Sequence, residues 1–269
     1  MATAPADWTA SAVGITPRFE TSGDPYQAAT GDFDGMGISC GALQWNIGKS
    51  SLQPMVLAVG KPAVIAAMPV FGNELWTACN GTVAQGLRIV RGWQTGTSLK
   101  PKPKAELRAL MGTPAIRAQQ QERIDRVAAK SFDAATEWAA VSTGGPASKR
   151  LFCWFFDLVT QNGGLDGLTP RRVNDFIAAN RPDKVDDLIC DFLATRTGRS
   201  GHIRDAKKNG ELWRDAATPE KLEILCMSYL RSETAIPRWR HVVLNRKGAI
   251  AMGKGWVNSS SWDFSAHGL

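Results

Sequence analysis

A glycine-rich acidic segment near the N-terminus constrains the fold of this chain more than any other feature. Residues 31–41 read GDFDGMGISCG and hold four glycines, two aspartates and one serine within eleven positions. Glycine and aspartate both disfavour helix interiors, so this segment cannot form a long helix. We expect a tight turn that leads into a short strand over residues 38–43.

Most of the remaining chain has a helical pattern. Between residues 104 and 252, apolar side chains recur at spacings of three and four, which is typical of one face of a helix. The clearest series is Val185, Leu188, Ile189, Phe192 and Leu193. We therefore predict a mostly α (α+β) protein, a helical body with a small β insert near its N-terminus.

Several residues predict where helices begin and end. Thr169 and Thr218 each precede a proline, and threonine caps a helix while proline fits its first turn. Gly163 and Gly253 follow apolar helical stretches and predict their ends. Residues 100–104, KPKPK, suggest a stiff solvated linker.

The charge of the chain limits its partners. Among 269 residues, 32 are Lys or Arg and 25 are Asp or Glu, which gives a formal net charge of +7. Such a balance attracts polyanions, among them nucleic acid, anionic lipid and the bacterial cell wall. We expect no nucleic-acid partner, because no dense basic run is interleaved with aromatic residues.

The sequence also shows no sign of membrane insertion, export or metal binding. No apolar run approaches the roughly 20 residues that span a bilayer, and the N-terminus lacks the pattern of a secretory signal. Five cysteines without a CxxC pair predict buried free thiols. The three histidines are isolated, so we expect no metal site and no cofactor.

The glycine-rich segment is compatible with more than one chemistry. Its first residues resemble a calcium loop, but Met36 and Leu43 occupy positions where that loop needs oxygen ligands. Residues 37–41 match G-x-S-x-G, the nucleophile elbow of serine hydrolases, which would make Ser39 a nucleophile. That elbow requires a strand before the serine and a helix after it, so this alternative depends on the fold.

A pair of carboxylates is the other reading of this region. Glycoside hydrolysis needs a protonated carboxyl as the acid and an ionised carboxylate that activates water or stabilises the cationic sugar. Glu20 lies where a short helix should end, and the apolar neighbour Phe19 would raise the pKa of its carboxyl. Asp34 lies among glycine amides that can donate hydrogen bonds to it. Spacing alone favours the interpretation that both acids are solvated loop residues.

Glu20 followed by GDFDGMGISCGALQWN resembles the catalytic segment of the chitosanase-like branch of the lysozyme superfamily, around glycoside hydrolase family 46. In that family a Glu ends the first long helix and a Gly-Asp-Gly-x-Gly-x-Thr segment follows. Here residues 34–39 match that segment, with Ser39 in place of the usual Thr. The GALQWN extension, residues 156–164 and residues 246–255 look more like peptidoglycan-cleaving relatives in phage endolysins and secretion-system effectors.

The resemblance implies a role for each matching residue. Glu20 would be the general acid, Asp34 the general base, and Ser39 would position the attacking water. Asp32 is the rival for the base and a possible substrate contact. The other implied substrate contacts are Gln44, Trp45, Asn46, Gln161 and Asn162.

The resemblance further implies a single lysozyme-like, two-lobed catalytic domain over residues 1–269, with a small lobe over about 20–72 and a helical lobe over about 73–255. We expect a peptidoglycan hydrolase of the muramidase type. The alternatives are a chitosanase or chitinase with the same site, a serine hydrolase at Ser39, and a non-catalytic wall-binding module. Without a signal peptide, the protein would reach the periplasmic cell wall by phage lysis or a secretion apparatus, and an immunity protein is a possible partner.

Overall fold

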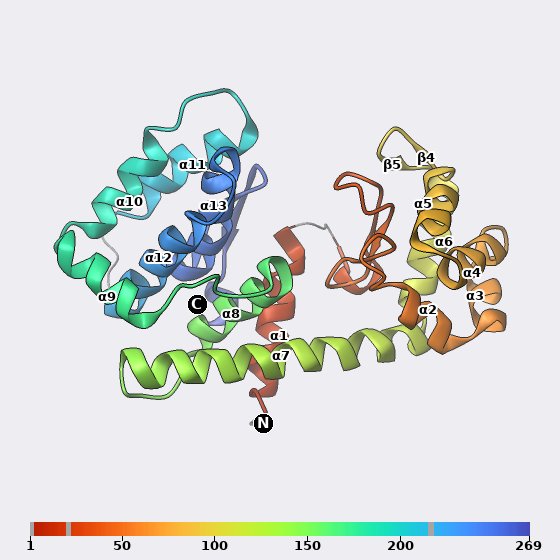
Figure 1. Ribbon diagram of the computed structural model, residues 1–269, viewed down its shortest axis with the longest axis horizontal. Helices are drawn as coiled ribbons and strands as arrows, with labels where there is room; N and C mark the ends of the chain where they lie inside the picture. Colours follow the sequence, from red (N-terminus) through yellow and green to blue (C-terminus); the bar gives the residue numbers. More distant parts are fainter. Residues whose placement is uncertain (1–2, 20–22, 215–217) are drawn as a thin grey trace. The chain divides into compact units, whose positions relative to one another are not determined.

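The computed structural model describes residues 3–19, 23–214 and 218–269, and the chain divides into two compact units (Figure 1). Unit 1 comprises Met1–Phe19 and Val127–Leu269, and unit 2 comprises Glu20–Arg126. The prediction of a mostly α fold is confirmed, because thirteen α-helices and only short strands are present in the described residues.

Unit 2 contains a small sheet and a group of helices. The helices are α2 (Gln53–Val59), α3 (Lys61–Ala67), α4 (Gly72–Asn80), α5 (Val83–Arg91), α6 (Pro101–Gly112) and the first part of α7 (Pro114–Ser142). The remaining elements are η2 (Pro25–Gln27), β1 (Ala29–Thr30), β2 (Ser39–Cys40), β3 (Trp45–Asn46), β4 (Gln94–Thr95) and β5 (Ser98–Leu99). Strands β1, β2 and β3 form an antiparallel sheet in that order, with Ser39 opposite both Thr30 and Asn46.

Unit 1 is a helical body with one terminal hairpin. Its helices are α1 (Ala6–Ile15), the rest of α7, α8 (Lys149–Asn162), α9 (Pro170–Ala179), α10 (Val185–Ala194), α11 (Gly201–Leu212), α12 (Pro219–Ser232) and α13 (Arg240–Met252). The shorter elements are η1 (Pro17–Phe19), η3 (Pro237–Trp239), β6 (Lys254–Val257), β7 (Ser260–Asp263) and η4 (Ser265–His267). In this unit α13 packs against α8, α11, α12 and β6.

The core of unit 1 is built around α8. Its side chains Phe152, Trp154, Phe155 and Phe156 are all fully buried. Burial of a large apolar side chain contributes roughly 1.5–3 kcal/mol, so this one helix supplies much of the apolar stabilisation of the unit. All five cysteines are buried and free, which confirms the expectation from the sequence.

The helix boundaries predicted from caps and glycines are confirmed. The Thr169 hydroxyl accepts a hydrogen bond from the Arg172 amide, and the Thr218 hydroxyl accepts one from the Lys221 amide. Gly163 and Gly253 end α8 and α13 in the left-handed conformation, each at φ 77°. The threonine caps and the glycine ends both depend only on local sequence.

Three local expectations are corrected by the structure. Residues 100–104 are no linker, since α6 begins at Pro101, and prolines are tolerated where first-turn amides need no partner within the helix. The strand expected over residues 38–43 is only Ser39–Cys40, because Gly41 turns the chain at φ 73°. The boundary expected near residue 72 differs from that of unit 2, which extends to Arg126 because helices α2 to α6 pack together.

Across the described residues, we find no helix that combines the length and hydrophobicity needed to span a bilayer.

Candidate functional site

The acidic turn, defined here as residues 31–38, connects β1 to β2 in unit 2. The buried Gln94 side chain holds both ends of this turn. Its Oε1 accepts a hydrogen bond from the Asp32 amide at 2.8 Å, and its Nε2 donates to the Gly37 carbonyl at 2.8 Å and to the Val90 carbonyl at 3.1 Å. The shape of the turn is therefore set by a residue about 60 positions away in the chain.

Glycine is required at two positions of the acidic turn. A Cβ atom on Gly31 would lie 2.1 Å from the Thr97 carbonyl oxygen, so any side chain would displace the neighbouring β4–β5 hairpin. Gly37 has φ +87°, and a Cβ there would lie 2.7 Å from a methyl group of Leu87. The glycines thus let the turn pack closely on unit 2.

Asp32 is held firmly within the turn. Its Oδ1 accepts a hydrogen bond from the Gly37 amide at 2.8 Å, and its Oδ2 accepts one from Arg91 Nε at 2.7 Å. Burial acts to raise the pKa of Asp32, but the Gly37 amide and the Arg91 guanidinium outweigh it, so the pKa lies below its ordinary value. Asp32 is therefore an ionised carboxylate with both oxygens already bonded.

Asp34 has a different environment two residues later. Its side chain is exposed, and Oδ1 accepts a hydrogen bond from the Met36 amide at 3.0 Å. Such a carboxylate can accept a further hydrogen bond from water or from a ligand. Of the two aspartates, Asp34 is thus the one available for chemistry.

Phe33, Arg91 and Gln94 belong to this site but were not among the residues singled out from the sequence. Phe33 lies between the two aspartates and is 61% exposed, which is unusual for a large apolar side chain. An aromatic residue between two acids in a glycine-rich turn is a local signal that could have identified it. Arg91 and Gln94 lie far along the chain and carry no such signal.

Ser39 and Asn46 are mainly structural. Ser39 is only 1% exposed and lies in β2, where it pairs with both neighbouring strands. Asn46 is buried too, and its side chain accepts a hydrogen bond from the Lys49 amide at 2.8 Å and donates to the Gln44 carbonyl at 3.3 Å. The burial of Ser39 weakens its expected role in positioning water.

Strand β2 also argues against a nucleophile elbow at Ser39. After β2 the chain enters the turn that begins at Gly41, whereas an elbow requires a helix directly after the serine. Of the neighbouring expected contacts, Trp45 is buried, and Gln44 Oε1 accepts a hydrogen bond from the Thr30 hydroxyl at 3.2 Å. Gln44 remains partly exposed and can reach solvent.

Glu20, the expected general acid, lies outside the described residues, but the segment before it is well defined in unit 1. The carbonyl of Phe19 accepts a hydrogen bond from Asn258 Nδ2 at 2.7 Å. The Arg246 guanidinium lies 4.7 Å from the centre of the Phe19 ring, and Arg246 Nη2 donates to the Thr16 carbonyl at 2.9 Å. Two side chains near the C-terminus thus hold the end of η1.

A fully buried ion pair supports this arrangement. Asp157 of α8 accepts hydrogen bonds from Arg246 Nε at 2.8 Å and from Lys247 Nζ at 3.1 Å. Burial acts to raise the pKa of Asp157, but the two cations outweigh it and lower that pKa. Burial lowers the pKa of Lys247 to about 8, although Asp157 acts in the opposite direction. Asp157 therefore orients Arg246, which in turn contacts Thr16 and Phe19.

Gln161 and Asn162 form the exposed last turn of α8 in unit 1. Gly163 then ends the helix, as the sequence predicts. Their side chains face solvent and can bind a ligand, and Asn162 also forms part of a helix end.

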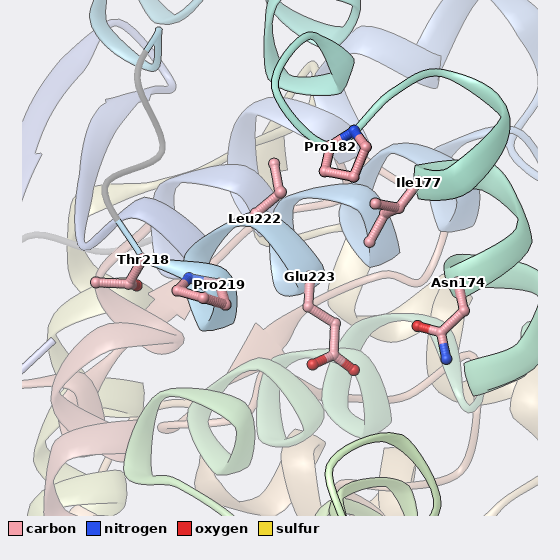
Figure 2. A pocket seen from close by; sticks show the side chains of 7 residues that line it. All are labelled: Asn174, Ile177, Pro182, Thr218, Pro219, Leu222 and Glu223. Atoms are coloured by element: carbon pink, nitrogen blue, oxygen red, sulfur yellow. The ribbon is translucent and has the colours of Figure 1, made fainter.

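A separate hollow of about 460 Å³ lies in unit 1 between α9 and α12. Figure 2 shows Ile177, Pro182 and Leu222 in its wall, with the Glu223 carboxylate below them. That carboxylate accepts a hydrogen bond from the Trp138 indole at 2.8 Å. The hollow contains none of the residues expected to be functional, and its acid is already bonded.

Within the described ranges, no three His, Cys, Asp or Glu side chains come together as a metal site would require. A comparison of the sequence with models of known protein families gives no match, and a comparison with curated protein sequences gives none either.

Proposed function

We propose that this protein is a glycoside hydrolase that cleaves the glycan strand of peptidoglycan as an N-acetylmuramidase. The observation that carries the proposal is the acidic turn, in which the aspartates at positions 32 and 34 have different environments. Asp32 is paired with Arg91, whereas Asp34 is exposed. Acid–base glycoside hydrolysis requires two carboxyl groups, and in our proposal Glu20 provides the acid and Asp34 the base.

The proposed reaction inverts the configuration at the anomeric carbon. The protonated Glu20 carboxyl gives its proton to the glycosidic oxygen as the bond between that oxygen and the anomeric carbon breaks. Water attacks the anomeric carbon from the opposite face, and the Asp34 carboxylate takes the proton that the water loses. In such enzymes the two carboxyl groups are roughly 6.5–9.5 Å apart, which leaves space for the water.

The surroundings of the two aspartates favour Asp34 as the base. Both oxygens of Asp32 already accept hydrogen bonds, from the Gly37 amide and from Arg91. A carboxylate in this state is a poor proton acceptor, because protonation would break a charge-assisted hydrogen bond. In our proposal Asp32 therefore fixes the turn, and Phe33 offers its exposed ring to the apolar face of a sugar.

The anchoring of η1 in unit 1 also supports the proposal. Arg246 and Asn258 hold the backbone of the segment that ends immediately before Glu20. In our proposal this segment leads into the general acid, and its fixed backbone lowers the entropic cost of ordering the acid for reaction. We also propose that the protein acts on the periplasmic cell wall after phage lysis or delivery by a secretion apparatus.

The test is mass spectrometry of the fragments released from purified peptidoglycan. The wild type should release reducing muramic acid ends, while Glu20→Gln and Asp34→Asn should each lower the rate by a factor of about 10² to 10⁴. Glu122→Gln is the matched control, since it removes an exposed carboxylate of unit 2 that pairs with Arg126, and it should retain full activity. Circular dichroism would verify that all three variants are folded.

Other products would point to other activities. Reducing glucosamine ends would indicate a glucosaminidase, and anhydromuramic ends would indicate transglycosylation without a base at Asp34. Release of no fragments, with digestion of chitosan or chitin, would move the assignment to another polymer. Activity that survives Glu20→Gln but not Ser39→Ala would overturn the proposal in favour of a serine hydrolase. Binding to the wall without cleavage would leave a non-catalytic module.

A further inference from the structure

A group of cationic side chains in unit 1 has no part in the proposed hydrolysis. Arg196 follows α10, His202 lies in the first turn of α11, and His241 lies in the first turn of α13. The hydrogen bond from Asn245 Nδ2 to the His202 carbonyl, at 3.0 Å, connects α13 to α11 at this point. The His202 and Trp239 rings are in edge contact, with centroids 6.4 Å apart.

The chain segments that form this group contain no acidic residue. Neither residues 192–204 nor residues 234–262 contain any Asp or Glu. The first turns of α11 and α13 hold no acidic residue either, although helix N-termini favour negative charge and disfavour cations. His241 therefore lies at a helix N-terminus that disfavours its protonated form.

Arg196 differs from the neighbouring Arg240 in how its charge is balanced. The two guanidinium groups lie 4.2 and 4.4 Å from the centre of the same Phe192 ring. Arg240 donates a hydrogen bond to Glu233 at 2.9 Å, but among the described residues Arg196 forms no ion pair with a carboxylate. The Nε of Arg196 is also buried without a hydrogen-bond partner in the described part of the chain.

The charged groups that act on His241 come from α11 and from the segment that follows α10. Burial lowers the pKa of His241, and the nearby His202 and Arg196 lower it further. Glu233, which follows α12, is engaged by Arg240 and Arg172, and the buried Asp205 of α11 accepts a hydrogen bond from the Ser259 amide. Both of these acids thus already have partners.

We propose that Arg196, His202 and His241 form a binding site for an oxyanion, a phosphate or a carboxylate group. Arginine and protonated imidazole both donate charge-assisted hydrogen bonds to such a group, and the two helix N-termini add to its stabilisation. Trp239, which is 45% exposed, lies beside the site and offers a ring face to whatever moiety carries the anion. This site is independent of the proposed hydrolysis and of Asp34.

The first experiment is an NMR titration of the histidine side chains of the full chain, at constant ionic strength, in chloride and in inorganic phosphate. A bound anion should raise the pKa of His241 by about 1, because an opposite charge within about 4–6 Å favours the protonated imidazole. His267 is the internal control, since its ring packs against Gly14 of α1, and its pKa should not respond. Acetate in place of phosphate tests the carboxylate form of the ligand.

Variants then show whether the proposed residues bind the anion. Arg196→Gln should weaken phosphate binding by about tenfold or more, because it removes a charge-assisted hydrogen bond to the anion. Arg196→Lys keeps the charge without the planar fork and should give an intermediate affinity. Arg171→Gln is the matched control, as it removes the same charge from a side chain that is 91% exposed on α9.

A binding experiment with a phosphate polymer identifies the source of the anion. Tighter binding of poly(glycerol phosphate) than of free phosphate would show that the site takes an anion carried on a larger molecule, while equal binding would show a site for the free ion. The proposal is overturned if neither phosphate nor acetate changes the His241 titration relative to chloride. It is also overturned if Arg196→Gln responds like the wild type, or if His267 responds as strongly as His241.

Discussion

Asp157 in unit 1 and Asp32 in unit 2 both pair with an arginine, but their surroundings differ. Asp157 is completely buried and meets two cations, Arg246 and Lys247. The Asp32 side chain is 12% exposed and meets one arginine, Arg91, which is itself 50% exposed. Water screens the second pair, so its contribution to stability is smaller. The buried pair therefore serves to fix the fold, whereas the partly exposed pair shapes a turn that still presents Asp34 to solvent.

The largest effect is expected from breaking the buried pair. Asp157→Asn leaves two cations buried without a carboxylate, so the free energy of unfolding should fall by about 3–5 kcal/mol in a urea titration. Asp7→Asn is the matched control, because Asp7 is exposed and pairs with Lys149 at 3.2 Å, and it should cost less than about 1 kcal/mol. Equal losses in the two variants would show that burial does not distinguish these pairs.

The second prediction concerns the pH dependence of the same pair. Lys247 has a pKa of about 8 when folded and about 10.4 when unfolded, so between these values the unfolded chain binds more protons. The Lys247 contribution to stability should therefore rise with pH across this window by up to about 3 kcal/mol, so the wild type should gain that much stability relative to Lys247→Met.

Urea midpoints near pH 7.5 and pH 10 would measure this effect. The cysteines titrate in both proteins, so their contribution cancels in the difference between wild type and variant. Lys130→Met, at an exposed position of α7, should show the same pH dependence as the wild type. A parallel pH dependence of wild type and Lys247→Met would contradict the prediction.

Within unit 2, the largest effect is expected at Gln94. Gln94→Leu removes three hydrogen bonds that hold the acidic turn, including the acceptor of the Asp32 amide. We expect a loss of about 2 kcal/mol and faster hydrogen exchange at the Asp32 amide. Gln85→Leu, on the first turn of α5, should change neither quantity appreciably. Unaltered exchange in Gln94→Leu would mean that the turn is held by other contacts.

The smallest effect is expected at the partly exposed pair. Arg91→Gln should cost about 1 kcal/mol near neutral pH. The lowered pKa of Asp32 contributes stability that is present above its ordinary value of 3.8 and is lost as the pH falls through the folded value. The acid limb of the stability curve should therefore be shallower in Arg91→Gln than in Arg88→Gln, a matched change on the same helix. Identical acid limbs in the two variants would show that Arg91 does not lower the pKa of Asp32.

The two units also differ in how much the sequence predicts of them. The caps at Thr169 and Thr218 and the ends at Gly163 and Gly253 are local, and the sequence predicts all four correctly. In unit 2 the glycine-rich turn and a strand after it are predicted, but the two-residue length of β2 and the start of α6 at Pro101 are not. Strands of two residues carry little periodicity, and their pairing depends on distant contacts.

Composition, apolar spacing and capping residues by themselves determined that this protein is mostly helical, with free buried thiols and an acidic turn near its N-terminus. The tertiary structure alone decided which acid of that turn is free. Asp32 and Asp34 are equivalent in the sequence, and only the folding of Arg91 and Gln94 onto the turn distinguishes them. Hydrogen bonds and burial are set by residues far apart in the chain. The local pattern that locates the two carboxylates therefore cannot show which is paired with an arginine and which is exposed.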